Sequence, residues 1–220
     1  MSEKLSKYKF RKLSTEAFKN GLRLHFDSIL LFNNKSYPSA FQLSVLAMEE
    51  FSKSNWVEHY FWTSITNDGF PDEKFEQEWL KLLYFHPRKQ KAFFGWRMEL
   101  DYSPKFVKFV RDKKLEAKKQ HATYVGLEKN KSKINVKSRI STPAKIKELD
   151  AKQMIAMMND YLSEICNMKL IQECYFDLEE KDELITLELQ ERLNEWKPKS
   201  GLRSKRWFTE YINKNKKHNS

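Results

Sequence analysis

Residues 40–53 read Ala-Phe-Gln-Leu-Ser-Val-Leu-Ala-Met-Glu-Glu-Phe-Ser-Lys, an apolar helical pattern that is interrupted by charge at Glu49, Glu50 and Lys53. Residues spaced three or four apart share one face of this helix, namely Ala40, Leu43, Ala47, Glu50 and Ser54. Glu50 thus continues a row of small packing residues. A carboxylate there costs free energy unless a cation meets it, and Lys53 lies one turn further on. The stretch therefore predicts a packed helix that carries either a functional site or a fixed contact between helices.

The composition favours an all-α protein. The chain has 220 residues, of which 40% are hydrophobic, with 16 Phe, 9 Tyr and 6 Trp to build a core. Gly and Pro number only 5 and 6, few for a fold with many tight β-turns. We expect an antiparallel helical bundle with a short extended or hairpin insertion and additional C-terminal helices.

Charge is unevenly distributed along the chain. The net charge is +11, and residues 103–147 hold 14 Lys or Arg against 3 acidic residues. In residues 176–195 the balance reverses to 8 acidic residues against 2 basic ones. A clustered basic surface favours a polyanionic partner such as RNA. The alternative is that these lysines form solvated helix faces, which are common on helical proteins.

Several function classes lack their motifs in this chain. There is no glycine-rich phosphate loop, no nucleophile elbow, no His-Glu-x-x-His and no Cys/His cluster with zinc spacing. We therefore expect no metal and no cofactor. The charged N-terminus lacks the apolar core of a signal peptide, and no run is long enough to span a membrane. These features predict a cytoplasmic protein without membrane association.

The periodicity predicts three parts: a basic, mobile lead-in (1–13), a helical domain (14–175) with an insertion near 122–142, and a C-terminal helical extension with a basic tail (176–220). Helices are expected at about 15–32, 37–61, 72–83, 88–96, 104–120, 150–174 and 181–196, with a last one docking near 207–212. Residues 123–142 alternate in the manner of a hairpin. Asp150, with Gln153, is expected to begin the long helix as a capping box.

Two polar groups stand out in this bundle. Glu49, Glu50 and Lys53 lie on the second expected helix, and His86, Arg88 and Lys89 lie where His86-Pro87 separates two later helices. Antiparallel helices joined by short loops could bring the two groups together.

These elements resemble a known family. Ala47-Met-Glu-Glu-Phe-Ser-Lys53 is similar to the A-x-E-E-x-G-K element of the AbiV-type abortive infection proteins, with Ser52 where the family usually has Gly. His86-x-x-Lys89 resembles the second element of that family. The extended stretch and the long helix follow in the family's order, so that the resemblance covers roughly residues 14–175.

AbiV-type proteins belong to the HEPN superfamily, whose members are helical bundles that often dimerise and often cleave RNA. The resemblance implies an antiphage effector that acts on RNA or translation after infection, a homodimer, an RNA or ribosome partner and a phage-encoded activator. The usual HEPN nuclease signature, Arg and His separated by four to six residues, is absent here. Nine residues separate Arg111 from His121, and no other pair comes closer to the pattern.

If the site cleaves RNA, the chemistry needs no metal. His86 can take the 2′-hydroxyl proton, and Glu50 can orient Lys53 or His86. Lys89, Arg88 or Lys53 can stabilise the developing phosphorane charge. The remaining expected RNA-binding residues are Lys53, Arg88, Arg111, Lys114 and Lys118.

Structural alternatives stand beside each assignment. Glu50–Lys53 can be a buried structural pair, and His86 can cap a helix end. The basic residues 111–114 and 118–119 can be a solvated helix face, and His25 is expected in the core. The whole chain can equally be a non-catalytic regulator that binds RNA, the ribosome or a phage protein, or a toxin neutralised by a separate partner.

Overall fold

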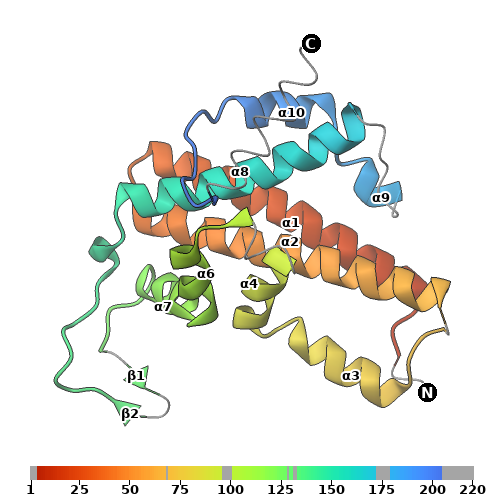
Figure 1. The fold of residues 1–220 in the computed structure, drawn as a ribbon, viewed down its shortest axis with the longest axis horizontal. Helices are drawn as coiled ribbons and strands as arrows, with labels where there is room; N and C mark the ends of the chain where they lie inside the picture. Colours follow the sequence, from red (N-terminus) through yellow and green to blue (C-terminus); the bar gives the residue numbers. More distant parts are fainter. Residues whose placement is uncertain are drawn as a thin grey trace.

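Two long antiparallel helices, α1 (Lys7–Asn33) and α2 (Tyr37–Thr66), run side by side through the centre of the molecule (Figure 1). They are seen in a computed structural model that describes residues 4–67, 69–95, 101–127, 129–130, 133–171 and 179–204. Helix α2 matches its expected start and carries the Glu49–Lys53 stretch near its middle. The all-α expectation is confirmed, because β1 (Lys129–Asn130) and β2 (Lys133–Ile134) are the only strands in these ranges.

The other helices pack around this pair. Helix α8 (Glu148–Leu170) packs across α1 and α2 and contacts α10 (Leu187–Asn194), while α9 (Glu179–Asp182) contacts α1. Helices α4 (His86–Phe94) and α7 (Lys114–His121) contact α2, and α6 (Pro104–Arg111) bridges α4 and α7. In Figure 1 these three lie on the side of α2 away from α10. Helix α3 (Glu73–Leu82) extends beyond them, and a 3-10 turn, Pro143–Lys145, precedes α8.

Local sequence explains where the helices begin. Ser6 accepts a hydrogen bond from the Lys9 amide at the start of α1, and Asp72 accepts one from the Phe75 amide at the start of α3. Pro38 and Pro87 occupy the first turns of α2 and α4, where proline suits the helix.

Helix α1 begins at Lys7, eight residues before its expected start. Residues 7–13, expected as a mobile lead-in, are its first turns because Phe10 is fully buried among Val57, Phe61 and Trp79. Only one position per turn is buried in this segment, and with lysines around it the sequence shows no clear helical periodicity.

The expected helix 104–120 is in fact two helices. Lys113 adopts a left-handed backbone conformation with φ 58° and separates α6 from α7. The expected helix 181–196 is likewise divided into α9 and α10. The left-handed conformation of Lys113, a non-glycine residue, has no local sequence signal, since it depends on how α6 and α7 pack.

The hairpin expectation is confirmed: β1 and β2 pair antiparallel, and Gly126 and Ser141 form an isolated antiparallel bridge on either side of them in the sequence. Helix α8 begins at Glu148, two residues before its expected start. Asp150 is its third residue and accepts a hydrogen bond from the Lys147 amide at 3.0 Å. Residues 172–178 and the expected tail helix at 207–212 lie outside the described residues.

The main core lies where α1, α2 and α8 meet. Gly21 allows the closest approach, because a Cβ atom there would lie 2.6 Å from Phe51 Cε1. Phe51 is fully buried and packs against the Phe18 ring at 5.4 Å. In the described part of the chain, no helix combines the length and hydropathy needed to cross a membrane.

Candidate functional site

Glu49, in the middle of α2, is the centre of a buried polar cluster between α2, α4 and α7. Its side chain is 1% exposed. Oε1 accepts hydrogen bonds from Gln90 Nε2 and Lys119 Nζ, both at 2.8 Å. Oε2 lies 2.5 Å from His86 Nδ1 and 3.7 Å from Lys89 Nζ. We call these residues, with Glu116, the Glu49 cluster. Several donors compensate the desolvated carboxylate, which an isolated buried charge could not tolerate.

Glu116 of α7 is the second carboxylate of the Glu49 cluster. It accepts hydrogen bonds from Gln90 Nε2 at 2.6 Å and lies 2.8 Å from Lys119 Nζ. Burial opposes ionisation of Glu116, but hydrogen bonds from Lys119 and Gln120 outweigh it and hold the pKa of the carboxyl below its ordinary value. Gln90 and Lys119 therefore each bridge two carboxylates and join α4 and α7 to α2.

His86 is the member of the cluster that meets solvent. It is the first residue of α4, and its side chain is 46% exposed although its partner Glu49 is buried. An ionised Glu49 can only accept, so Nδ1 carries the proton. When the imidazole is neutral, Nε2 is then the basic nitrogen, and it makes no hydrogen bond to any residue the structure describes. A carboxylate thus sets the tautomer of a half-exposed histidine.

Lys89 lies one turn further along α4 and is nearly buried, with a side chain 6% exposed. Burial lowers the pKa of its ammonium, an effect opposed by Glu49 and reinforced by Lys53 and Lys119. Lys89 is therefore a desolvated cation beside His86, in a position where charge interactions are less screened than in water.

Glu50 and Lys53 form a separate pair beside the cluster. Lys53 Nζ lies 2.6 Å from Glu50 Oε1, and Asn20 of α1 donates to Glu50 Oε2 at 3.3 Å. Both side chains are mostly buried. Of the two roles expected for Glu50, orienting Lys53 agrees with this geometry, while His86 is held by the neighbouring Glu49.

The expected RNA-binding residues do not form one surface. Arg88, Arg111 and Lys114 are exposed, and Lys114 lies 3.7 Å from Asp112. Lys118 is instead a link between helices, with Nζ 2.5 Å from Asp150 of α8 and above the Phe41 ring at 5.5 Å.

Sequence reasoning missed three members of the cluster: Gln90, Glu116 and Lys119. The alternative of a solvated face at 118–119 is wrong for Lys119, whose side chain is 4% exposed. The available signals were the spacings Glu116–Lys119 and His86–Gln90, each one helical turn. The expectation that His25 lies in the core is confirmed: its side chain is fully buried, and Nε2 lies 3.3 Å from Asn159 Oδ1.

In the described ranges, no three His, Cys, Asp or Glu side chains converge in a way that could hold a metal ion. The cluster can instead transfer a proton through His86 and stabilise negative charge through Lys89.

Comparison with known proteins links this chain to one family. The HEPN_AbiV family model, described as AbiV, matches residues 9–163, a range that includes most of α1, the helices α2, α4 and α7, and the whole Glu49 cluster. Neither the curated proteins nor the solved structures gave a match.

Proposed function

Because this chain belongs to the HEPN_AbiV family, which indicates an antiphage abortive-infection role, we propose that it is a cytoplasmic effector that cleaves RNA after phage infection. The observation that carries the proposal is the 2.5 Å contact between buried Glu49 and half-exposed His86. Carboxylate-oriented histidines are a recurring arrangement for general acid–base work.

In the proposed reaction His86 is the general base. Glu49 holds Nδ1–H, so that Nε2 accepts the proton of an RNA 2′-hydroxyl. The 2′-oxygen attacks the adjacent phosphorus and the bond to the 5′-oxygen breaks. The products are a 2′,3′-cyclic phosphate and a 5′-hydroxyl that takes its proton from solvent. No metal takes part.

Positive charge around His86 has two proposed roles. Lys89 stabilises the phosphorane, and its low exposure strengthens that interaction. Arg88 and Lys53 contact neighbouring phosphates, with Glu50 holding Lys53 in place. Arg111 and Lys114, both exposed, extend this contact along α6 and α7, whereas Lys118 stays paired with Asp150. In keeping with family behaviour, the effector is a homodimer that responds to a phage-encoded activator.

A second candidate function is a non-catalytic regulator that arrests translation by binding RNA or the ribosome. The observation that favours it is that three hydrogen-bonding groups and the Lys89 ammonium at 3.7 Å compensate Glu49, as in a cluster that fixes helix packing. The chain also lacks the Arg-x4–6-His signature.

An RNA-cleavage assay separates the two functions. Wild type and His86→Ala are incubated with cellular RNA in EDTA, with and without extract from infected cells. The nuclease proposal expects 2′,3′-cyclic ends from wild type and none from His86→Ala. His121→Ala, at the half-buried end of α7, is the matched control and should cleave normally. Intact RNA in every condition would support the regulator instead.

A further inference from the structure

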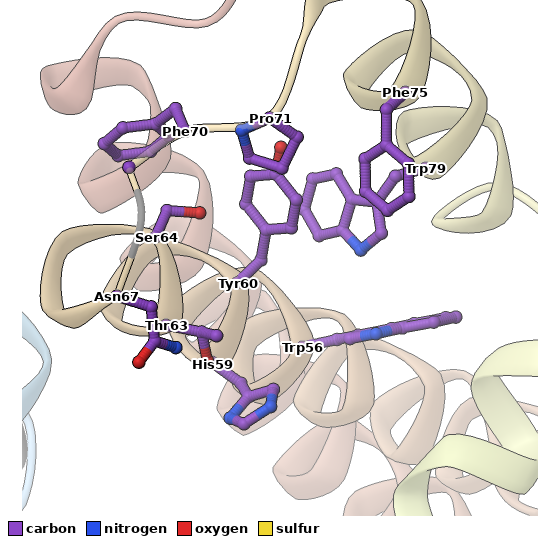
Figure 2. A pocket seen from close by; sticks show the side chains of 11 residues that line it. Trp56, His59, Tyr60, Thr63, Ser64, Asn67, Phe70, Pro71, Phe75 and Trp79 are labelled. Atoms are coloured by element: carbon purple, nitrogen blue, oxygen red, sulfur yellow. The ribbon is translucent and has the colours of Figure 1, made fainter.

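An aromatic hollow of about 490 Å³ lies between the C-terminal half of α2, the connection after it and α3 (Figure 2). Its floor is the ring pair Tyr60–Trp79, stacked at 4.0 Å with an angle of 21° between the planes. Phe10 packs against both rings from α1. The floor is therefore rigid and preformed.

Two further aromatic side chains border the hollow without being buried. Phe75 is 55% exposed, and Trp56 is partly exposed. Figure 2 shows the Trp56 ring below the floor pair and Phe75 on the opposite side, in front of Trp79. Trp56 packs in part against the apolar cluster around Phe10, but the remaining surface of both rings is left in water, which sacrifices apolar burial. Their flat faces are available to a ligand.

Polar groups occupy the other side of the hollow. His59, Thr63 and Asn67 extend from α2 and its end, and all three are exposed (Figure 2). Their side chains make no hydrogen bond to another described residue. An imidazole, a hydroxyl and an amide provide both donors and acceptors.

The described lining residues also exclude some occupants. None of them is Asp, Glu, Lys or Arg, so no lining side chain forms an ion pair with the occupant. None is Leu, Ile, Val or Met, the residues that typically line a groove for an apolar helix. Aromatic faces together with hydrogen-bonding edges fit a planar heteroaromatic ring, as in the recognition of unpaired bases.

The hollow and the Glu49 cluster lie on one face of α2. Trp56 follows Glu49 by seven residues, which is two helical turns and about 10 Å along the axis. That span corresponds to about three stacked nucleotides at roughly 3.4 Å each. Lys53 lies between them on the same face, where a phosphate would pass.

We propose that this hollow is a base-binding subsite that holds one unpaired nucleobase of a single-stranded RNA, whose backbone runs along α2 to His86. The base stacks on Trp56, and its edge meets the polar groups of α2. The assignment rests on the proposed function in that RNA is the ligand, and it adds a specificity determinant about three nucleotides from the cleaved bond.

Binding is tested in the His86→Ala protein, so that cleavage cannot interfere. A fluorescently labelled single-stranded oligoribonucleotide is titrated and followed by anisotropy. Trp56→Leu should weaken binding about 5- to 150-fold, the range expected for one stacked base. Trp56→Phe, which keeps a ring, should restore most of the affinity. Tyr8→Ala removes an even more exposed ring from α1, outside the hollow, and should change nothing.

Abasic substitution along the oligonucleotide gives an independent measurement. An abasic site at one position should lower the affinity of the Trp56-containing protein but leave the affinity of Trp56→Leu unchanged. Duplex RNA should bind equally well to both proteins. Circular dichroism and thermal melting confirm that the variants fold.

The outcomes for the subsite and for the nuclease are distinguishable. Trp56-dependent binding without cleavage by the His86-containing protein, with or without extract from infected cells, supports the subsite and refutes the nuclease. Cleavage with single-strand affinity unchanged within twofold in Trp56→Leu overturns the subsite alone. Loss of antiphage protection in Trp56→Leu with unchanged RNA affinity also overturns it, and indicates a protein partner at the hollow.

Discussion

Glu49 Oε2 lies 2.5 Å from His86 Nδ1, although Glu49 is buried in the centre of α2 and His86 meets solvent at the start of α4. This contact joins the interior of the bundle to its surface. The same carboxylate also holds Gln90 and Lys119, so that any role of His86 in catalysis is coupled to the packing of α4 and α7 on α2.

Glu49→Gln should lower the free energy of unfolding by about 3–5 kcal/mol, because removing one partner of a buried charged network leaves the others uncompensated. Lys89 and Lys119 would lose the carboxylate that meets them. Urea unfolding measures the change. Glu78→Gln is the matched control at the exposed Lys81 pair, where a change within about 0.5 kcal/mol is expected. Equal effects of the two variants would contradict the importance of the cluster.

His25 should make stability depend on pH. Burial lowers the pKa of His25 to about 4, whereas an ordinary histidine titrates near 6.5. The unfolded chain therefore binds a proton before the folded one does, and stability falls as the pH drops from 6.5 to 4. The difference corresponds to about 3 kcal/mol.

His25→Gln removes this titration, so the stability advantage of wild type over the variant should shrink by about 3 kcal/mol between pH 7 and pH 4. Comparing the two proteins cancels the opposite contribution of Asp160, whose pKa burial raises to about 6. A constant difference for His25→Gln would disprove the prediction.

Gly21→Ala should destabilise the α1–α2 contact by about 1–3 kcal/mol, because its Cβ would lie 2.6 Å from Phe51 Cε1. Thermal unfolding measures this. The control is Gly126→Ala, where no heavy atom lies within 4 Å of the added Cβ. Adding Phe51→Leu to Gly21→Ala should cost less than the sum of the two single changes, since the smaller side chain relieves the clash. Strict additivity would show that the clash is not the cause.

Arg88→Gln, Arg111→Gln and Lys114→Gln test the basic surface separately from catalysis. Removing one exposed cation that contacts a phosphate should reduce the magnitude of the slope of log affinity against log salt by about 0.7 for single-stranded RNA. Titrations at several salt concentrations measure the slope. Lys152→Gln, on α8 and 3.7 Å from Glu148, is the control. If none of the three substitutions alters the slope, RNA binds to another surface.

Much of the architecture was predictable because local patterns decide it. The start of α2 follows from Pro38 in its first turn, and the hairpin follows from alternation in residues 123–142. The break at Lys113 was not predictable, since a left-handed non-glycine residue is held there by the packing of α6 and α7. The early start of α1 depends on Phe10, which is buried by residues from α2 and α3.

The candidate site was likewise predictable only in part. The sequence by itself determined the helical class, the family elements around Glu49 and His86, and the fact that charge enters a packed helix. It could not determine which of two adjacent glutamates meets His86. Helix α2 is buried on several sides, as Ala47, Met48, Glu49, Phe51 and Ser52 show, so it has no single apolar stripe from which to read its orientation. Only the packing of α4 and α7 against α2 decided that Glu49 holds His86, because a buried carboxylate is stable only where donors from other helices reach it.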